Sequence, residues 1–282
     1  MASKSATYFL SAGRCGTQWL ADSLQSVIGL DTAIVNHERI PKTWVPESAN
    51  IRRYFSGSKL HEIYNNYNFL KYLDDVKSLI VTNDYIETGW PSFCFAPILL
   101  KEFQKNIKFV FLLKSPVEFA ISLTTHDFYL REDNMAKESA LLPSDPGTYL
   151  NGYWGALWSE MNHYEKCLFQ WFQINSHILN FLETAGANYI VIKSEQLFSK
   201  SDRKTIDQMM SYIGYDDLSD AMIDKKKTVF DIHHAQTAAC DWRTVFNFPK
   251  VVELAKQLGY NLNKIDDQKI KDRYFLKETP ND

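Results

Sequence analysis

The 282-residue sequence has no long uninterrupted apolar run and no excess of charge of one sign. No stretch approaches the roughly eighteen apolar residues that a membrane-spanning helix needs. The apolar part of the opening segment MASKSATYFLSAG is too short and too interrupted for a signal peptide. The formal net charge of −3 does not suit a nucleic-acid-binding surface. We therefore expect a protein with neither nucleic-acid nor membrane partners.

Cysteine is also scarce, and no two cysteines are close in the sequence. The chain has four, which form no C-x-x-C pair: Cys15, Cys94, Cys167 and Cys240. This spacing is typical of reduced thiols and not of a disulfide framework or a zinc site. We expect a cytoplasmic protein without a metal centre.

Short apolar segments alternate with helical patterns along the chain, 45% of which is hydrophobic. Five segments are expected strands: residues 7–11, 33–36, 79–82, 108–113 and 189–193. The fourth, KFVFLL, is apolar without alternation, as in a strand covered on both faces of a parallel sheet. The alternation predicts a single α/β domain over residues 1–282, with an open parallel sheet as the middle of three layers.

Helices are expected after several of these strands. An apolar stripe predicts one over residues 17–28. The run SPVE at 115–118 is a capping box with proline at the first helical position, and it opens another. An aromatic helix is expected over residues 154–183, closed by Gly186. The polar segment 131–152 is longer than an ordinary connection, and we expect it to be a lid or substrate loop.

A glycine-containing turn, SAGRCGTQ at residues 11–18, joins the first expected strand to the first helix. Its glycines permit a tight turn, and the helix start offers unpaired backbone N–H groups and a positive dipole end to an anion. Arg14 adds a guanidinium that can fork onto phosphate or sulfate oxygens, and Thr17 adds a hydroxyl. The predicted anion-binding residues are Gly13, Arg14, Cys15, Gly16, Thr17 and Gln18.

Two other interpretations of this turn stay open. An ATP- or GTP-dependent P-loop enzyme needs G-x-x-x-x-G-K-[ST], with a lysine on the phosphates and a hydroxyl on magnesium. Here Thr17 follows Gly16 directly, without that lysine. The turn could also be an ordinary connection with an incidental arginine, and the octapeptide alone does not decide.

A second candidate anion site follows the strand at 108–113. Lys114 stands at the carboxyl end of that strand, and Ser122 lies two turns into the next helix. Ligands bind at the carboxyl ends of strands in open α/β sheets, so the two could hold a phosphate away from the first turn. Taken singly, each has a simpler role, as a solvated lysine and a helix-packing serine.

Together the two motifs resemble the family of sulfotransferases that use 3′-phosphoadenosine-5′-phosphosulfate (PAPS). In that family the first strand–loop–helix holds the 5′-phosphosulfate, and a strand ending in Arg-x-Pro, with a serine on the next helix, holds the 3′-phosphate. SAGRCGTQ is similar to the first element and LLKSPVEFAISL to the second. The similarity continues with Trp171, with YIVIKSEQL at 189–197 and with VVELAKQLGYN at 251–261. It implies a P-loop-like fold and sulfuryl transfer from PAPS without a metal, leaving 3′,5′-adenosine bisphosphate (PAP).

Two positions depart from the family pattern. Lys114 stands where the family has an arginine, which keeps the charge but loses the bidentate fork. Cys15 stands where a small residue is usual. The basic run at 225–227 lies in the region where the family has a basic loop near the 3′-phosphate.

The resemblance also implies a catalytic base. In one branch of the family a glutamate soon after the phosphate-loop helix is the base, and Glu38 matches it. His37 is the second candidate, since a neutral imidazole can take up a proton near pH 7. In the cytosolic branch the base is a histidine after a later strand, where this chain has Asp84 or Glu87. A plain structural role for Glu38 would be a surface ion pair with Arg39. The pair His233-His234 is a poorer candidate, because adjacent side chains of an extended chain point opposite ways.

The sequence thus indicates an enzyme that sulfates a hydroxyl or amine of a small-molecule acceptor. The aromatic and acidic segment 149–165, with Glu132, Asp133 and Asp145, suits a polar or cationic alcohol. We expect a secondary metabolite or a sugar. The alternatives are a small-molecule or nucleotide kinase of the P-loop type and a non-catalytic nucleotide-binding protein of the same fold.

Overall fold

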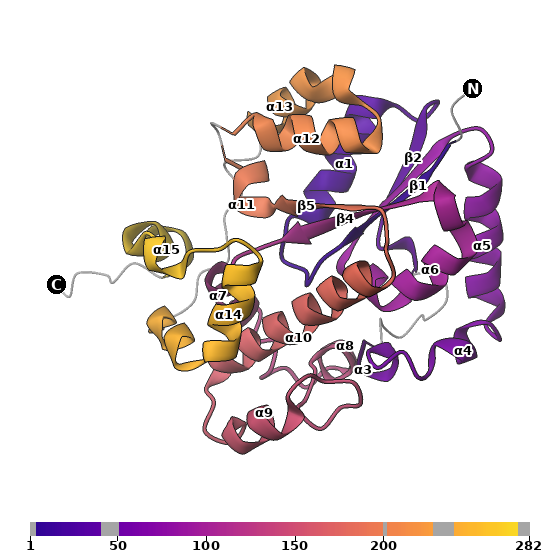
Figure 1. Ribbon diagram of the computed structural model, residues 1–282. Coiled ribbons are helices and arrows are strands. Elements are labelled where there is room, and N and C mark those ends of the chain that lie inside the picture. Colours follow the sequence, from indigo (N-terminus) through magenta and orange to yellow (C-terminus); the bar gives the residue numbers. More distant parts are fainter. Residues whose placement is uncertain (1–3, 41–50, 200–201, 228–239, 276–282) are drawn as a thin grey trace.

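A five-stranded parallel sheet runs through the centre of the molecule (Figure 1). The computed structural model describes residues 4–40, 51–199, 202–227 and 240–275. The strand order is β2-β3-β1-β4-β5. The strands are β1 (Ala6–Leu10), β2 (Ala33–His37), β3 (Asp84–Thr88), β4 (Ile107–Leu113) and β5 (Tyr189–Lys193). Because all pairings are parallel, the carboxyl ends of the strands meet at one edge.

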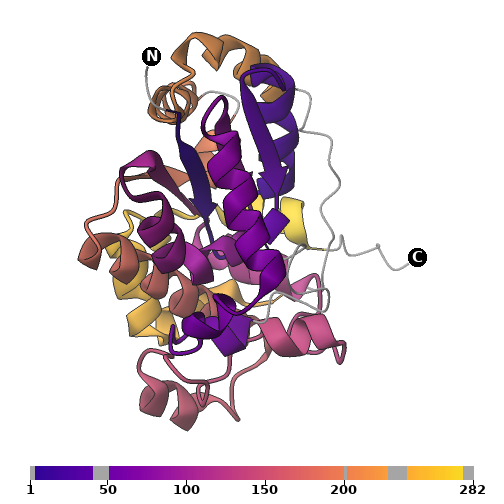
Figure 2. The same ribbon diagram turned by 90° about the vertical axis from the view of Figure 1, so that its right-hand side faces the viewer.

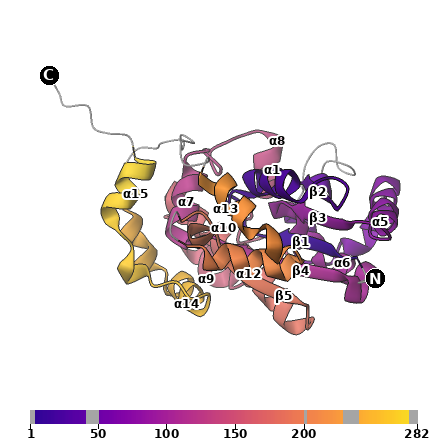
Figure 3. The same cartoon turned by 90° about the horizontal axis from the view of Figure 1, so that it is seen from above.

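Helices cover both faces of this sheet (Figure 3). Alternate residues of a strand point to opposite faces, so Phe109 and Phe111 enter one core while Val110 and Leu112 enter the other. The first core is closed by α5 (Tyr67–Leu79), α6 (Ala96–Phe103), α7 (Pro116–Thr124) and α10 (His163–Thr184). The second is closed by α1 (Thr17–Ile28), α12 (Lys204–Ile213) and α13 (Ser219–Lys227). The predicted three-layer α/β fold is confirmed.

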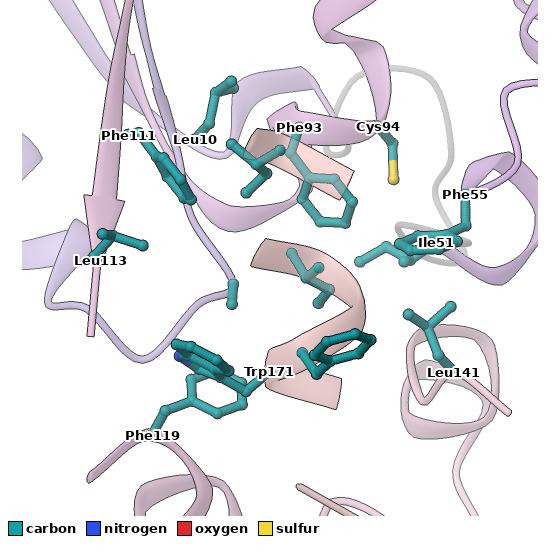
Figure 4. Close-up of a cluster of buried hydrophobic side chains, with 14 of the residues drawn as sticks. Leu10, Ile51, Phe55, Phe93, Cys94, Phe111, Leu113, Phe119, Leu141 and Trp171 are labelled. Carbon is teal, nitrogen blue, oxygen red and sulfur yellow. The ribbon is translucent and has the colours of Figure 1, made fainter. Parts of the chain in front are cut away.

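Large apolar side chains fill the first core. Figure 4 shows Leu113 of β4 on one side of this core and the side chains of Phe119 and Trp171 below it. All three side chains are fully buried. Trp171 also donates from Nε1 to the carbonyl of Lys114 at 2.8 Å, which fixes the end of β4 to α10.

The remaining helices lie around this core. In Figure 2, where α5 faces the viewer, four of them lie below the sheet: α3 (Ile51–Tyr54), α4 (Leu60–Ile63), α8 (Asn134–Ser139) and α9 (Asn151–Leu157). The other three lie on the side toward which β4 points (Figure 1): α11 (Ser194–Leu197), α14 (Pro249–Gln257) and α15 (Asp267–Tyr274). None of the described helices is long and apolar enough to cross a membrane.

The predicted cap of α7 is half right. The Ser115 side chain accepts from the N–H of Glu118 at 3.2 Å, as a capping box requires. The N–H of Ser115, however, donates to Oε1 of Glu195 at 2.5 Å instead of to Glu118. The N-terminus of α7, which follows β4, is therefore hydrogen-bonded to α11, which follows the neighbouring strand β5.

Two expected elements are wrong in extent. Residues 79–82 are no strand: the N–H of Ile80 bonds to Val76 and that of Asn83 to Leu79, so the segment ends α5, and β3 begins at Asp84. The expected helix over 154–183 is two helices, α9 and α10. A second capping box, between Asn162 and Glu165, starts α10 afresh. Gly186, with φ of 57°, follows its end as expected.

The segment 131–152 is anchored at several points. Arg52 of α3 forms a bidentate ion pair with Asp145, with N–O distances of 2.8 and 2.6 Å. The side chain of Gln170 accepts from the N–H of Leu141 at 2.9 Å, and that of Gln173 accepts from the N–H of Tyr149 at 2.7 Å. The segment thus packs on α3 and α10, and its role as a lid stays a prediction.

Candidate functional site

The turn between β1 and α1 has the geometry of an anion-binding loop. Gly13, Arg14 and Gly16 have φ of 91°, 56° and 76°, all in the left-handed region. A Cβ at Gly16 would lie 2.5 Å from the ring of Phe198, so this position also needs glycine for space. The turn therefore brings the start of α1, with its unpaired N–H groups, to the carboxyl edge of the sheet.

Arg14 reaches from this turn to α7. Its Nε donates to the hydroxyl of Ser122 at 3.3 Å, and Nη2 lies 2.5 Å from Nε2 of His126. Burial and the charge of Arg14 lower the pKa of His126, so a neutral imidazole accepts from the guanidinium. The turn at residues 11–18 and the Lys114–Ser122 motif are thus adjacent in space, whereas the sequence suggested two separate sites.

Lys114 is buried and is not the solvated lysine that its position alone would allow. Its Nζ donates to the carbonyl of Arg14 at 3.2 Å and lies 5.6 Å from the centre of the Tyr274 ring. Burial lowers the pKa of Lys114, and the nearby carboxylate of Glu118 opposes this shift. Lys114 therefore links the turn between β1 and α1 to the end of β4 and to α15.

Cys15 and Gln18 contribute less than their neighbours to this cluster. The thiol of Cys15 is buried and donates to the carbonyl of Gly13 at 3.0 Å, and burial raises its pKa to about 12. This hydrogen bond stabilises the conformation of the turn. The side chain of Gln18 is exposed and bonds to Asp22, one turn along α1, at 3.1 Å. Thr17 is buried at the start of the same helix.

Glu38 lies at the same edge of the sheet, after β2. Its N–H donates to the carbonyl of Thr88 at 2.8 Å, and its φ is 52°. A Cβ at Gly89 would lie only 2.6 Å from Cγ of Glu38. The Glu38 side chain thus fills the space that a side chain directly after β3 would occupy.

His37 is a neighbour of this carboxylate. Its Nε2 lies 3.5 Å from Oε1 of Glu38, and its Nδ1 lies 3.2 Å from the hydroxyl of Thr88. That hydroxyl in turn donates to the carbonyl of Thr17 at 2.9 Å. The chain of contacts connects both candidate bases to the first residue of α1. Arg39, by contrast, forms its ion pair with Asp75 at 2.9 Å.

The two carboxylates of β3 have other roles. Asp84 begins the strand, at the opposite edge of the sheet from the turn, where it accepts from Lys4 and Tyr215. Glu87 is fully buried and accepts from Tyr72, Tyr85 and the N–H of Ile40 at 2.6, 2.5 and 2.8 Å. Burial raises the pKa of Glu87. Glu87 therefore supports the segment that carries Glu38 and does not face the turn.

Several residues of the site escaped the sequence analysis. His126 stands four residues after Ser122, a helical spacing that places both on one face, and this could have indicated it. Arg273 and Tyr274 had no such signal, because their contacts with α7 span 155 and 156 residues. Of the basic run at 225–227, Lys225 is exposed on α13. His233 and His234 lie outside the described residues.

These features define a class: an α/β protein with a parallel sheet and a glycine-containing turn at its carboxyl edge that carries an arginine. Among the described residues, no group of three or more histidines, cysteines and acidic residues could hold a metal ion. No protein-family model and no curated protein matches the chain.

Solved structures do match. The sulfotransferase domain from the curacin biosynthetic pathway has a TM-score of 0.54 and 15% identity over 92% of this chain and 99% of that one. The sulfotransferase from Alicyclobacillus acidocaldarius has a TM-score of 0.50 and 15% identity over 93% and 98%. The sulfotransferase domain of the Synechococcus PCC 7002 olefin synthase has a TM-score of 0.50 and 14% identity over the same shares, 93% and 98%. The chain therefore has the sulfotransferase fold, as the resemblance in the sequence predicts.

Proposed function

We propose that this protein is a sulfotransferase that moves a sulfuryl group from PAPS to a small-molecule acceptor. The observation that carries this proposal is the convergence of Arg14, Lys114 and Ser122 at the carboxyl edge of a sheet with the sulfotransferase fold. Two cations and a hydroxyl from two separate motifs gather where such sheets bind their ligands. A donor with a phosphosulfate and a separate phosphate would use both.

The donor's phosphosulfate would bind to the turn at residues 13–18 and to Arg14. Arg14 is an exposed residue, and its guanidinium donates to a neutral hydroxyl at Ser122. Hydrogen bonds from a guanidinium to charged oxygens are about twice as strong as those between neutral groups. The donor would therefore compete well for Arg14. Lys114 and Ser122 would then hold the 3′-phosphate.

Glu38 is the proposed base. In the reaction, the acceptor oxygen or nitrogen forms a bond to sulfur while the bond from sulfur to the bridging oxygen of the donor breaks. PAP leaves with that electron pair, and the proton of the acceptor passes to the carboxylate of Glu38. Positioning and charge stabilisation supply most of the catalysis in such transfers. The space at Gly89 that admits the Glu38 side chain supports this role, as does its connection to Thr17 through Thr88.

The proposed acceptor is a hydroxyl or amine of a secondary metabolite or a sugar. The similar curacin domain comes from a biosynthetic pathway, which supports a small acceptor here. The aromatic and acidic segment 149–165, with Glu132, Asp133 and Asp145, would supply acceptor contacts. The adjoining segment 131–152 is bonded to α3 and α10, which would hold these residues in place.

Thermal stabilisation by nucleotides tests the donor assignment. We expect PAP to raise the melting temperature more than ATP does at equal concentration, with no requirement for magnesium. A kinase of the P-loop type would instead be stabilised by ATP together with magnesium, because that motif binds the metal through its hydroxyl. A larger shift with magnesium-ATP than with PAP would therefore overturn the proposal.

A further inference from the structure

Thr88 bonds to both of the segments that meet at the carboxyl end of β3. It is the last residue of the strand and is fully buried. Its carbonyl accepts from the N–H of Glu38 at 2.8 Å, and its hydroxyl donates to the carbonyl of Thr17 at 2.9 Å. Thr17 begins α1 and belongs to the turn proposed to bind the phosphosulfate. Thr88 therefore connects the proposed base to the proposed donor site.

The same hydroxyl determines which nitrogen of His37 is protonated. A threonine hydroxyl has a single proton, and that of Thr88 is donated to the carbonyl of Thr17, which can only accept. The contact of 3.2 Å between this hydroxyl and Nδ1 of His37 therefore requires a proton on Nδ1. In its neutral form, His37 then has its proton on Nδ1 and a lone pair on Nε2.

The lone pair of Nε2 faces the carboxylate of Glu38. Nε2 lies 3.5 Å from Oε1, and the side chains of His37 and Glu38 are only 14% and 25% exposed. Two acceptors that face each other form no hydrogen bond, whereas one added proton creates a hydrogen bond between charged groups. The two side chains therefore bind a proton more favourably together than either would alone.

The backbone conformation of Glu38 makes this contact possible. Neighbouring side chains of a strand point to opposite faces, so residues 37 and 38 of a regular strand would not meet. Glu38 has φ of 52°, in the left-handed region, and this turns the chain directly after β2. The bond from its N–H to Thr88 holds that conformation. The strained residue is thus the one that brings the carboxylate to the imidazole.

The charged groups of the surrounding elements have partners of their own. Arg39, next along the chain from Glu38, pairs with Asp75 of α5 at 2.9 Å. Glu87 of β3 points to the other face of the sheet, where it is bonded to two tyrosines. Asp22 of α1 bonds to a glutamine of the same helix. The carboxylate of Glu38 is therefore the charged group placed against Nε2.

We propose that His37 and Glu38 act as a catalytic pair, in which Glu38 receives the proton of the acceptor and His37 receives it from Glu38. Thr88 is the positioning residue, which keeps the proton of neutral His37 on Nδ1 and so directs the lone pair of Nε2 toward the carboxylate. The inference rests on the proposed function. It makes partners of two residues that the sequence offers as alternative bases.

Bonds and charges balance over the two transfers. As the acceptor oxygen or nitrogen bonds to sulfur, its bond to hydrogen breaks and the proton bonds to a carboxylate oxygen of Glu38. That O–H bond then breaks as an N–H bond forms at Nε2, which leaves an imidazolium beside a carboxylate. Free imidazole is more basic than a free carboxylate by about two pKa units, so the second transfer is favourable. The imidazolium returns the proton to water after PAP leaves.

The first measurement needs no acceptor. In protein labelled with 15N-histidine, the nitrogen chemical shifts of His37, assigned with His37→Asn, report which nitrogen is protonated and how the ring titrates. We expect the Nδ1–H tautomer in the neutral ring, kept in Thr88→Ser and lost in Thr88→Val. Glu38→Gln should lower the midpoint of the His37 titration by about 1–3 pH units, the usual effect of losing a neighbouring carboxylate. Thr7→Val is the matched control, because Thr7 is also a buried threonine of the sheet, in β1.

The second measurement follows transfer from PAPS to three probes: glucose, tyramine and 2-naphthol. With the probe that the wild type sulfates fastest, His37→Asn and Thr88→Val should each lower kcat about tenfold, less than the loss of the base itself, and leave KM for PAPS unchanged. Thr88→Ser and Thr7→Val should keep the wild-type kcat. Because Thr88 acts through His37, the double variant should lose no more than His37→Asn alone.

The two measurements separate the pair from the proposed function. An Nε2–H tautomer in the neutral ring, or a midpoint that Glu38→Gln leaves unchanged, would overturn the pairing of His37 with Glu38. Losses of kcat that multiply in the double variant, or an equal loss in Thr7→Val, would overturn the role of Thr88. If the tautomer and the midpoint are as expected but the wild type sulfates none of the probes, the proposed function is wrong and the pair has no catalytic role.

Discussion

Two of the residues proposed for catalysis share an unusual backbone conformation. Arg14 and Glu38 have φ of 56° and 52°, and they are two of the five described non-glycine residues with positive φ. Such residues cost of order 1–3 kcal/mol each and persist where the surroundings fix them. Hydrogen bonds do so here, from Lys114 to the carbonyl of Arg14 and from the N–H of Glu38 to Thr88. The strain supports a functional role for both positions.

The first prediction concerns Arg14. Arg14→Ala should lower turnover about a hundredfold to a thousandfold at saturating donor, the usual cost of removing one preorganised donor to developing charge. Steady-state rates of PAP release measure it. Arg203→Ala is the control, because Arg203 is an exposed arginine that pairs with Asp207 and Asp220. Turnover of Arg14→Ala equal to that of the control would remove Arg14 from the site.

The second prediction concerns the base. Glu38→Gln should keep the affinity for PAP while turnover falls by roughly two to four orders of magnitude. Glu38→Asp should recover little, because a shorter side chain misplaces the carboxylate by about an ångström. His37→Ala should cost less. The pH–rate profile decides: its acidic limb should vanish in Glu38→Gln, and if it vanishes in His37→Ala instead, the histidine is the base.

Among the secondary-structure elements, the sequence predicted helices correctly where the residues that stabilise them are close together in the chain. The SPVE run predicted the start of α7, and the apolar stripe predicted α1. The partner of the Ser115 N–H could not be predicted, because Glu195 is 80 residues away. The break between α9 and α10 was readable in the Asn162–Glu165 capping box, but the aromatic periodicity on both sides hid it. The error at 79–82 came from a short apolar run, which is ambiguous between a helix end and a strand.

The third prediction tests the tie between α7 and α11. Glu195 is partly buried and accepts from the N–H of Ser115 and, at 3.2 Å, from the hydroxyl of Tyr260. Glu195→Ala leaves both donors without this acceptor and should lower the free energy of unfolding by about 1–3 kcal/mol, the cost of one unsatisfied buried donor, because Ser115 is buried and Tyr260 is only partly so. Urea denaturation measures the change. Glu253→Ala is the control, because Glu253 is exposed and pairs with Lys250. A loss no larger than that of the control would contradict the tie.

For the whole molecule, the alternation of strands and helices predicted the layers of the fold but not the order of the strands. That order depends on how the connections pack across the sheet. It places β3 between β2 and β1, so that Glu38, after β2, is connected to the turn through Thr88 at the end of β3. The position of α15 is likewise a product of tertiary packing against Glu118. The sequence motifs predicted most residues of the candidate site. His126 and Arg273 were identified only from long-range contacts in the structure.

The fourth prediction concerns acid stability. His177 of α10 lies between Phe55 and Phe93, with ring centres 4.8 and 5.8 Å away, and burial lowers its pKa to about 4. An unfolded histidine has a pKa of about 6.5, so between these values the unfolded chain binds a proton that the folded chain does not. The free energy of unfolding should therefore fall as the pH decreases from about 6.5 to about 4.

Urea denaturation at a series of pH values measures this effect. His177→Phe removes the titrating group, so its stability should fall less steeply over the same window. His61→Gln, at an exposed position of α4, should keep the dependence of the wild type. Equal slopes for the wild type and His177→Phe would show that His177 is not the group responsible.

The most direct test of sulfuryl transfer follows the label from sulfur-labelled PAPS into a panel of small hydroxyl and amine acceptors. We predict that the wild type moves label to at least one acceptor and releases an equal amount of PAP, and that Glu38→Gln binds PAP but moves little label. A wild-type protein that binds PAP and leaves the label in the donor with every acceptor would be a nucleotide-binding protein, and the proposed activity would be wrong.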